Sequence, residues 1–318
     1  MPLFSKHQTI HWITFAILLT TAGTQRLPAQ QTSTPTNQSP TPLPSGIKRS
    51  AVEGIENFIQ VSERVYSGGE PTSEGLKHLQ KLGVTYLLSV DGLSPDRDTA
   101  EKLGMKYVHI PMGYDGIDSK QIQDFVTLMA HHQGKLFVHC HHGKHRGPAA
   151  VAACLIISKE MTKEQAVQFM LGAGTGKDYQ GLWKSIADLD VTSYQPQDLS
   201  KLLVRSNAKT MAQWMAELDR SWETLQEQQK KPDAELSTAQ LLIVMEAFRE
   251  SARFADAAKE NQYGDKATKD RMIQWLKDCE QETASIQELV LSQAHEKARD
   301  RLRSLAKQCV DCHAEYRN

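Results

Sequence analysis

The sequence predicts two domains of different class: an α/β domain with a mainly parallel sheet flanked by helices, then an all-α four-helix bundle. Strand-like and helical patterns alternate between residues 51 and 189, as in parallel strands joined by helical crossovers. From residue 201 to 318 apolar residues recur at helical spacing without a strand pattern. A chain of 318 residues is long enough for each part to bury its own core.

The first 50 residues are predicted to lie outside both domains. Lys6 and His7 precede the apolar run WITFAILLTTAG, which is too short to span a bilayer and is typical of a signal peptide, residues 1–29, cleaved after Ala29. A membrane-anchoring helix is the alternative. Residues 30–50 are rich in Thr, Ser, Pro and Gln, which predicts a disordered linker. We therefore expect an exported, periplasmic protein without a stable membrane span.

The elements of residues 51–189 follow from local pattern. Ser73 is the expected cap of the first helix, which closes at Gly83. Short β-branched and aromatic runs predict strands over 57–61, 64–69, 84–90, 107–112 and 135–140. Apolar spacing predicts helices over 73–83, 119–132 and 147–160. The last helix is mostly apolar, so we expect it to be buried.

The stretch VHCHHGKHRGPAA, residues 138–150, joins the last strand to this buried helix. Unpaired N–H groups at a helix start favour a bound anion, and the same field favours the thiolate form of Cys140. Arg146 can contact two phosphoryl oxygens at once, while Gly143 and Gly147 let the backbone curl. This pattern predicts a phosphate-binding loop around a nucleophilic cysteine.

Four histidines in the same loop also permit a metal-binding interpretation. Neighbouring loop positions cannot all converge on one ion without a scaffold at fixed spacing, so we favour phosphate and expect no metal here. Four side chains are instead expected to line the mouth of the site and to favour a highly anionic substrate; surface histidines without a role are the alternative. These substrate-binding candidates are His141, His142, Lys144 and His145.

The run HCHHGKHR resembles the His-Cys-x5-Arg signature of cysteine-dependent tyrosine and dual-specificity phosphatases. Its Gly-Lys-His-Arg part is similar to the atypical dual-specificity group, some of which act on phosphoinositides or inositol pyrophosphates. The resemblance implies that Cys140 forms a cysteinyl-phosphate, that Arg146 and loop amides hold its oxygens, and that His139 sets the thiolate environment. It implies a phosphoprotein, phosphoinositide or inositol phosphate as substrate.

The resemblance also implies a general acid and contains one departure. Asp115, in the loop after the fourth strand, is the expected acid, with Asp118 as the alternative. The family places Ser or Thr after the arginine to ease departure of the thiolate, and this chain has Gly147 there. Slow turnover, or a role limited to binding, would follow.

Residues 190–200 are predicted to link the domains, and four amphipathic helices follow. One carries Met211 to Leu225, the next begins near Ser237, and the others carry Met272 to Ile286 and Leu302 to Tyr316. Cys154 and Cys279 fall on apolar helix faces, so we expect both to be packing residues.

The chain ends in CVDCHAEYRN, in which Cys309, Cys312 and His313 form the attachment pattern of a c-type haem. A redox-active dithiol would need a surrounding βαβ unit, and structural zinc a second ligand pair. The run resembles class II cytochromes c of the cytochrome c′ type, which implies one covalent haem c with His313 as axial ligand. Met211 or Met215 is the candidate distal ligand, and packing in the helical core is the alternative for both.

Together these patterns predict an exported cysteine-dependent phosphatase coupled to a haem domain that senses redox state or a gas. The alternative is an electron-transfer or sensor haem protein whose phosphatase-like domain only binds phosphorylated ligands. The partners expected are a phosphorylated substrate and a redox protein. The formal net charge of −1 gives no general attraction to nucleic acid or to a membrane surface.

Overall fold

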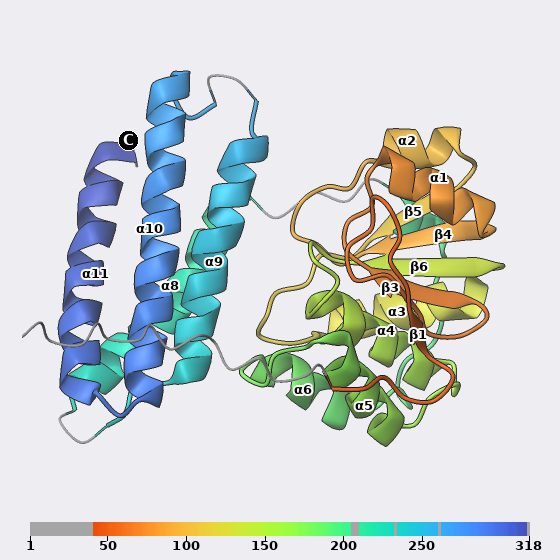
Figure 1. Cartoon of the computed structure of the whole chain (residues 1–318), viewed down its shortest axis with the longest axis horizontal. Coiled ribbons are helices and arrows are strands. Elements are labelled where there is room, and N and C mark those ends of the chain that lie inside the picture. The colour runs from red at the N-terminus through yellow and green to blue at the C-terminus, as the bar shows by residue number, and fades with distance from the viewer. Residues whose placement is uncertain (1–40, 205–209, 232–233, 260–261, 317–318) are drawn as a thin grey trace, which may run out of the picture. The chain divides into compact units, whose positions relative to one another are not determined.

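The computed structural model describes residues 41–204, 210–231, 234–259 and 262–316, and elements are named as in Figure 1. The chain from residue 40 onward forms one compact unit. The predicted signal peptide and the first part of the predicted linker lie outside the described residues. Within the described ranges, no helix combines the length and apolar character needed to cross a membrane.

The described strands form one six-stranded sheet in the order β1-β2-β3-β6-β4-β5. The strands are β1 Lys48–Arg49, β2 Ile59–Gln60, β3 Val65–Gly68, β4 Val84–Ser89, β5 Lys106–His109 and β6 Lys135–His139. β3, β6, β4 and β5 are parallel, while β1 and β2 add to the edge in antiparallel fashion. The prediction of a mainly parallel sheet is therefore confirmed, with β6 at its centre.

Helices cover both faces of this sheet, because successive strand side chains point to opposite sides. Leu87 and Phe137 pack with α1 on one face; Leu88 and Val138 pack with α4 on the other. The helices of this part are α1 Ser73–Lys81, α2 Arg97–Lys102, α3 Ser119–His131, α4 Arg146–Ile157, α5 Lys163–Ala173, α6 Gln180–Ala187 and α7 Ser200–Leu203. The cap of α1 is Thr72 rather than Ser73, because the Thr72 side chain accepts a hydrogen bond from the Gly75 N–H.

Both predicted edges of this domain are displaced in the structure. β1 lies inside the stretch predicted as linker, and Leu43 and Ile47 pack against the core. β1 consists of two exposed basic residues, so the sequence has no apolar pattern there that would predict a strand. At the other edge, Val191 and Leu199 of the predicted linker pack on the same core, as does Leu203, whose carbonyl accepts a hydrogen bond from Arg97 (3.2 Å). The segment predicted to link the domains thus packs on the first one.

The C-terminal region is helical, with α8 Met211–Gln229, α9 Thr238–Ala257, α10 Lys266–Leu291 and α11 His295–Tyr316. Thr210, Ser237 and Asp265 cap the first three of these helices. The helices pack in chain order, α8 on α9, α9 on α10 and α10 on α11. Their shared core contains apolar side chains at the spacing that the sequence indicated, among them Leu218, Trp222, Phe248, Leu276 and Leu302.

Candidate active site

The Cys140 thiol lies at the start of α4. β6 ends at His139 and α4 begins at Arg146 without a side-chain cap, so the first N–H groups of the helix are not used by a capping side chain. The Sγ atom of Cys140 is 3.4 Å from the position that a Cβ at Gly147 would occupy. Cys140 is only 4% exposed. The fold thus places a buried sulfur where the field of a helix favours a negative charge.

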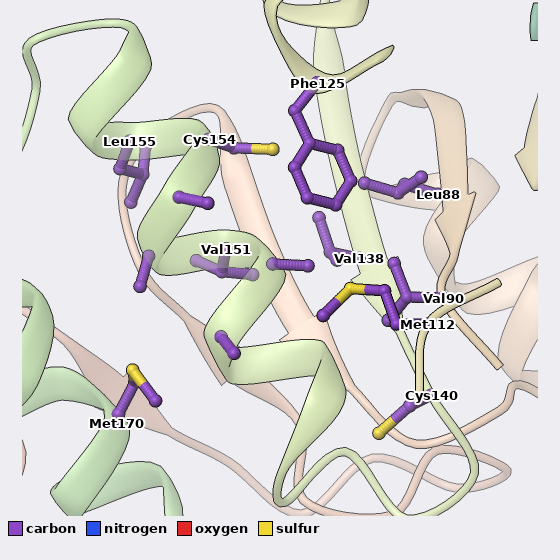
Figure 2. Close-up of a cluster of buried hydrophobic side chains, with 14 of the residues drawn as sticks. Leu88, Val90, Met112, Phe125, Val138, Cys140, Val151, Cys154, Leu155 and Met170 are labelled. Carbon is purple, nitrogen blue, oxygen red and sulfur yellow. The ribbon is translucent and has the colours of Figure 1, made fainter. Parts of the chain in front are cut away.

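Cys154 lies away from this loop. Figure 2 shows its side chain on α4 beside Phe125, while Cys140 lies at the end of β6. Cys154 is fully buried in the core, and burial raises the pKa of its thiol to about 12. It is therefore a packing residue, as the sequence indicated.

Asn57 fixes the backbone of the loop. Its Nδ2 donates hydrogen bonds to the carbonyls of Gly143 (2.8 Å) and Ala173 (2.9 Å), and its Oδ1 accepts one from Arg49 Nε (2.9 Å). Gly143 has φ of +67°, and a Cβ there would lie 2.2 Å from the Gly68 carbonyl carbon. Glycine is therefore required at this position. Sequence reasoning missed Asn57 because nothing in its local pattern marks it.

His139 is held by a buried tyrosine. The Tyr107 hydroxyl lies 2.5 Å from His139 Nε2, and both residues are buried. Burial raises the pKa of Tyr107 and lowers that of His139, so the imidazole is neutral and the phenol stays protonated. The hydroxyl then donates to Nε2, which leaves the imidazole proton on Nδ1. Tyr107 was not among the predicted site residues.

Arg146 is buried among carboxylates. Its Nη2 lies 2.6 Å from Glu250 Oε1 and 3.8 Å from Asp91 Oδ1, and its guanidinium lies over the Tyr114 ring, 4.3 Å from the centroid. Burial alone would lower the pKa of Arg146, but Glu250 and Asp91 raise it above the usual value. The guanidinium is therefore charged, and its buried Nε has no hydrogen-bond partner among the described residues.

Asp91 follows β4 and is a further residue that sequence reasoning missed. Its two carboxylate oxygens each accept a hydrogen bond from Arg253 (3.1 Å). Burial alone would raise the pKa of Asp91, but Arg146 and Arg253 hold it well below its usual range. Asp91 is thus ionised at neutral pH and positions charge rather than donating a proton.

Two of the four predicted mouth residues pair with one acid. Glu56 bonds to His142 Nδ1 and to Lys144 Nζ, each at 2.7 Å. His141 Nδ1 lies 3.9 Å from Glu70. Glu56, Glu70, His141 and His142 all line a surface pocket of ≈ 680 Å³. The rim of the loop is therefore of mixed charge, because acids stand beside the basic side chains that the sequence predicted at the mouth.

His145 departs from its predicted place at the mouth. Its ring stacks on Tyr179 (3.9 Å between centroids), and its Nδ1 accepts a hydrogen bond from the Gly176 N–H (3.2 Å). Burial lowers the pKa of His145 to about 3, so the ring is neutral at physiological pH. This histidine packs under the loop because it is the residue that leads into α4.

The motif histidines do not gather around a common metal position in the described residues. The one set of potential ligand atoms found there joins His141 to Glu70 and Asp91, within 4.8 Å of one another. Asp91 is already paired with Arg253 in that arrangement.

The two candidate acids differ in what they contact. Asp118 caps α3, and its Oδ1 accepts a hydrogen bond from the Gln121 N–H (2.8 Å) in a capping box. Asp115 is exposed in the loop after β5, with Oδ1 2.5 Å from where a Cβ at Gly113 would stand. Asp118 therefore has a structural task, which makes Asp115 the better candidate for proton transfer.

The second predicted site lies on the last turns of α11. Cys309 and Cys312 are half-buried free thiols, and His313 is exposed beside them. Met211 and Met215 are partly buried against the helical core. Cys279 is buried on α10, with its sulfur 3.7 Å from Gln308 Oε1. Two thiols and an imidazole on one helix form the donor set that covalent haem attachment needs.

Several solved structures are similar to part of this chain, and some of them are phosphatases by name. The chain is similar to TpbA of P. aeruginosa, with 22% identity over 45% of this chain and 90% of that one and a TM-score of 0.39. It is also similar to a putative phosphatase from Shewanella putrefaciens, with 17% identity over 43% of this chain and 97% of that one and a TM-score of 0.35. A third similar structure is the core catalytic domain of the PP-IP phosphatase SIW14 from S. cerevisiae, in complex with citrate. The identity is 18% over 45% of this chain and 90% of that one, and the TM-score is 0.39. No protein-family model matches the chain.

Proposed function

We propose that the α/β domain hydrolyses phosphoesters through a cysteinyl-phosphate on Cys140. The observation that carries this proposal is the position of the Cys140 sulfur at the start of α4, which has no side-chain cap. The sulfur lies 3.4 Å from the point where a Cβ at Gly147, the second residue of that helix, would stand. Arg146, charged and buried, is the first residue of the same helix. A nucleophile and an anion-binding group on one helix start are the components that displacement at phosphorus requires.

In the first step the Cys140 thiolate attacks phosphorus, so that the S–P bond forms while the bond from phosphorus to the leaving oxygen breaks. Asp115 gives its proton to that oxygen. Arg146 and the loop N–H groups hold the remaining phosphoryl oxygens. In the second step water attacks phosphorus, Asp115 takes a proton from the water, and the S–P bond breaks to restore the thiolate.

The rim of the loop bears on the substrate class. Glu56 and Glu70 stand beside the basic side chains of the loop, so added phosphate groups on a substrate would meet acids as well as bases. This arrangement favours a phosphoprotein side chain over an inositol carrying many phosphates, although phosphoinositides remain within the proposed class of phosphomonoesters.

Turnover of a phosphoester panel by the exported protein tests this proposal. The panel includes a phosphotyrosyl peptide, a phosphoseryl peptide, a phosphoinositide and an inositol phosphate. The wild type should release phosphate, Cys140→Ser should not, and Cys154→Ser serves as the matched cysteine control. Unchanged release by Cys140→Ser would remove the proposed nucleophile. Phosphate binding without release in the wild type would instead support the domain that only binds phosphorylated ligands.

We further propose that Cys309 and Cys312 attach one haem c, with His313 as axial ligand. The supporting observation is that both thiols are free and partly accessible and that His313 is exposed next to Cys312. Burial raises the pKa of Cys309 to about 11, unlike the lowered pKa of cysteines in redox-active dithiols. Haem would supply a one-electron redox centre or a gas-binding iron.

The N-terminal segment has the pattern of a signal peptide, which supports export. The proposed covalent haem agrees with a location outside the cytoplasm. A periplasmic phosphatase whose helical region senses redox state or a gas is the combined proposal, and a redox protein would then be a partner. An electron-transfer protein that merely binds phosphorylated ligands is the alternative, and it would share the haem but lack turnover.

A further inference from the structure

A glutamate from the helical region is bound to the arginine of the phosphate-binding loop. Glu250 on α9 lies with Oε1 2.6 Å from Arg146 Nη2, and the Tyr114 hydroxyl donates to the same oxygen (3.2 Å). Its Oε2 accepts a hydrogen bond from Arg253 (2.7 Å). Glu250 and Arg146 are each 1% exposed. The carboxylate therefore has the contacts of a bound anion rather than those of a solvated helix face.

Other contacts hold the same helix in place. The Tyr179 hydroxyl donates to Glu246 Oε1 (2.6 Å), one turn before Glu250. Leu242, one turn earlier again, is buried in the core of the α/β domain. On the neighbouring helix α8, Trp214 packs so closely on Gly92 that a Cβ there would lie 2.4 Å from its ring. Apolar and polar contacts thus join α8 and α9 to the α/β domain beside the Glu250–Arg146 pair.

A carboxylate and a phosphoryl group compete for the same guanidinium. Arg146 offers Nη2 to Glu250 and keeps a buried Nε without a partner among the described residues. A phosphoryl group that used both nitrogens of this fork would have to displace the Glu250 oxygen. Arg146 is almost completely buried and its Nη2 is already bound to Glu250, so a phosphoryl group could not take that nitrogen without a movement of α9.

We infer that α9 is an autoinhibitory element, in which the Glu250 carboxylate takes the place of a substrate phosphoryl oxygen on Arg146 and closes the site. The inference rests on the proposed phosphate-binding function and adds its regulation. Opening would carry Glu250 and Arg253 away together, since both lie on α9, and would leave Arg146 with Asp91 as its close carboxylate among the described residues. The Nη2 and Nε atoms of Arg146 would then be free to donate hydrogen bonds to the oxygens of a phosphate dianion. Whatever shifts the helical region away from the loop would then activate the domain.

Population arithmetic sets the size of the expected effect. If the closed state makes up about 90–99% of molecules, the apparent affinity for an anion is weakened about 10- to 100-fold. Removing the Glu250 charge should restore the lost affinity, because the closed state is then no longer stabilised by the ion pair with Arg146.

Binding of inorganic phosphate, measured by calorimetry on the full-length protein, is the test. All proteins carry Cys140→Ser, so the readout does not depend on turnover. Adding Glu250→Gln or Glu250→Ala should tighten phosphate binding about 10-fold or more. Glu288→Gln removes an exposed glutamate of α10 and should leave binding unchanged. Unchanged phosphate affinity in both Glu250 variants would overturn the autoinhibitory contact.

Hydrogen exchange on the protein without substitutions at Glu250 gives a second measurement that does not depend on a variant folding. Saturating phosphate should raise amide exchange in the part of α9 from Leu242 to Ala252, because that segment must leave the loop. Phosphate binding with unchanged exchange in this segment would also overturn the inference. The proposed hydrolysis is tested separately, by turnover of the ester panel. A protein that showed no Cys140-dependent turnover could still give either result in these two phosphate-binding measurements.

Discussion

The sulfur of Cys140 lies 3.4 Å from the point where a side chain at Gly147 would begin. A serine at this position would carry its hydroxyl directly beside the sulfur that leaves phosphorus in the second step of the proposed reaction. The Cβ would also stand 3.3 Å from the Cys140 amide nitrogen. A shift of the neighbouring atoms by a few tenths of an ångström would therefore make room for a side chain at this position. Gly147 does not have a positive φ, and its backbone therefore accepts other residues.

Gly147→Ser should raise turnover about 10-fold, equivalent to ~1.4 kcal/mol, and shrink a pre-steady-state burst of leaving group. The hydroxyl stabilises the departing thiolate, so the cysteinyl-phosphate no longer accumulates. Rapid-quench kinetics on an aryl phosphate measure both quantities. Gly147→Ala is the matched control, since it adds the Cβ alone. Equal effects of Ser and Ala would show that slow thiolate departure does not limit the wild type.

Asp115→Asn should reduce kcat/KM for alkyl phosphates by about 100-fold or more, and for aryl phosphates by less. Phenoxide leaves without prior protonation more readily than alkoxide does, so the loss depends on the leaving group. The measurement is a series of esters of graded leaving-group acidity.

Asp118→Asn is its control, because Asp118 caps α3. Asn caps a helix about as well as Asp does, so this change should leave both the stability and the dependence on leaving group close to those of the wild type. An Asp115→Asn protein with equal losses across the series would point to another acid.

His145→Gln should flatten the acid limb of the stability profile. The pKa of His145 is about 3 in the folded protein and ~6.5 in an unfolded chain. The unfolded state therefore binds the additional proton between these values, and stability falls as pH drops from about 6.5 towards 3. Each unit of difference corresponds to ~1.4 kcal/mol, so the effect should reach a few kcal/mol.

Urea unfolding at several pH values measures this slope. His131→Gln, at an exposed position of α3, should keep the wild-type slope, while His145→Gln should reduce it. An unchanged slope in His145→Gln would mean that this ring is not held neutral by burial.

If the proposed haem attachment is correct, full-length protein produced in a periplasm that matures c-type haem should retain haem after denaturation, and Cys309→Ser together with Cys312→Ser should abolish this retention. The reason is that each thiol would form a thioether with the haem. Absorbance after unfolding and the mass of the intact chain measure attachment independently of any activity. Cys279→Ser serves as the control and should keep the haem. A folded protein that never takes up haem would leave the pair as thiols without this role.

Local pattern was enough to predict the central strands, the loop and the four C-terminal helices. Apolar runs mark β4 and β6, and the glycines and charges between His139 and Gly147 mark a loop at a helix start. These features depend on residues adjacent in sequence. They could therefore be found without knowing the tertiary structure.

The partners of the loop could not be found in this way, because folding brings them together from distant segments. Glu246 and Glu250 have the spacing of a solvated helix face, yet each is 1% exposed. Asp91 follows a strand like many turn residues, and its role appears only when Arg253 reaches it from α9. Charge pairing across long sequence separations overrides the local expectation of exposure.

The hydrogen bonds of Asn57 have a consequence for how the α/β domain can be separated from its surroundings. Arg49 holds Asn57, and Asn57 holds the carbonyl of Gly143 in the loop. A truncation at residue 51 would remove Arg49 and the edge strand β1. Its damage would therefore emerge at the nucleophile's loop, far along the sequence from the cut, and an inactive fragment of this kind would say nothing about the chemistry of the intact chain.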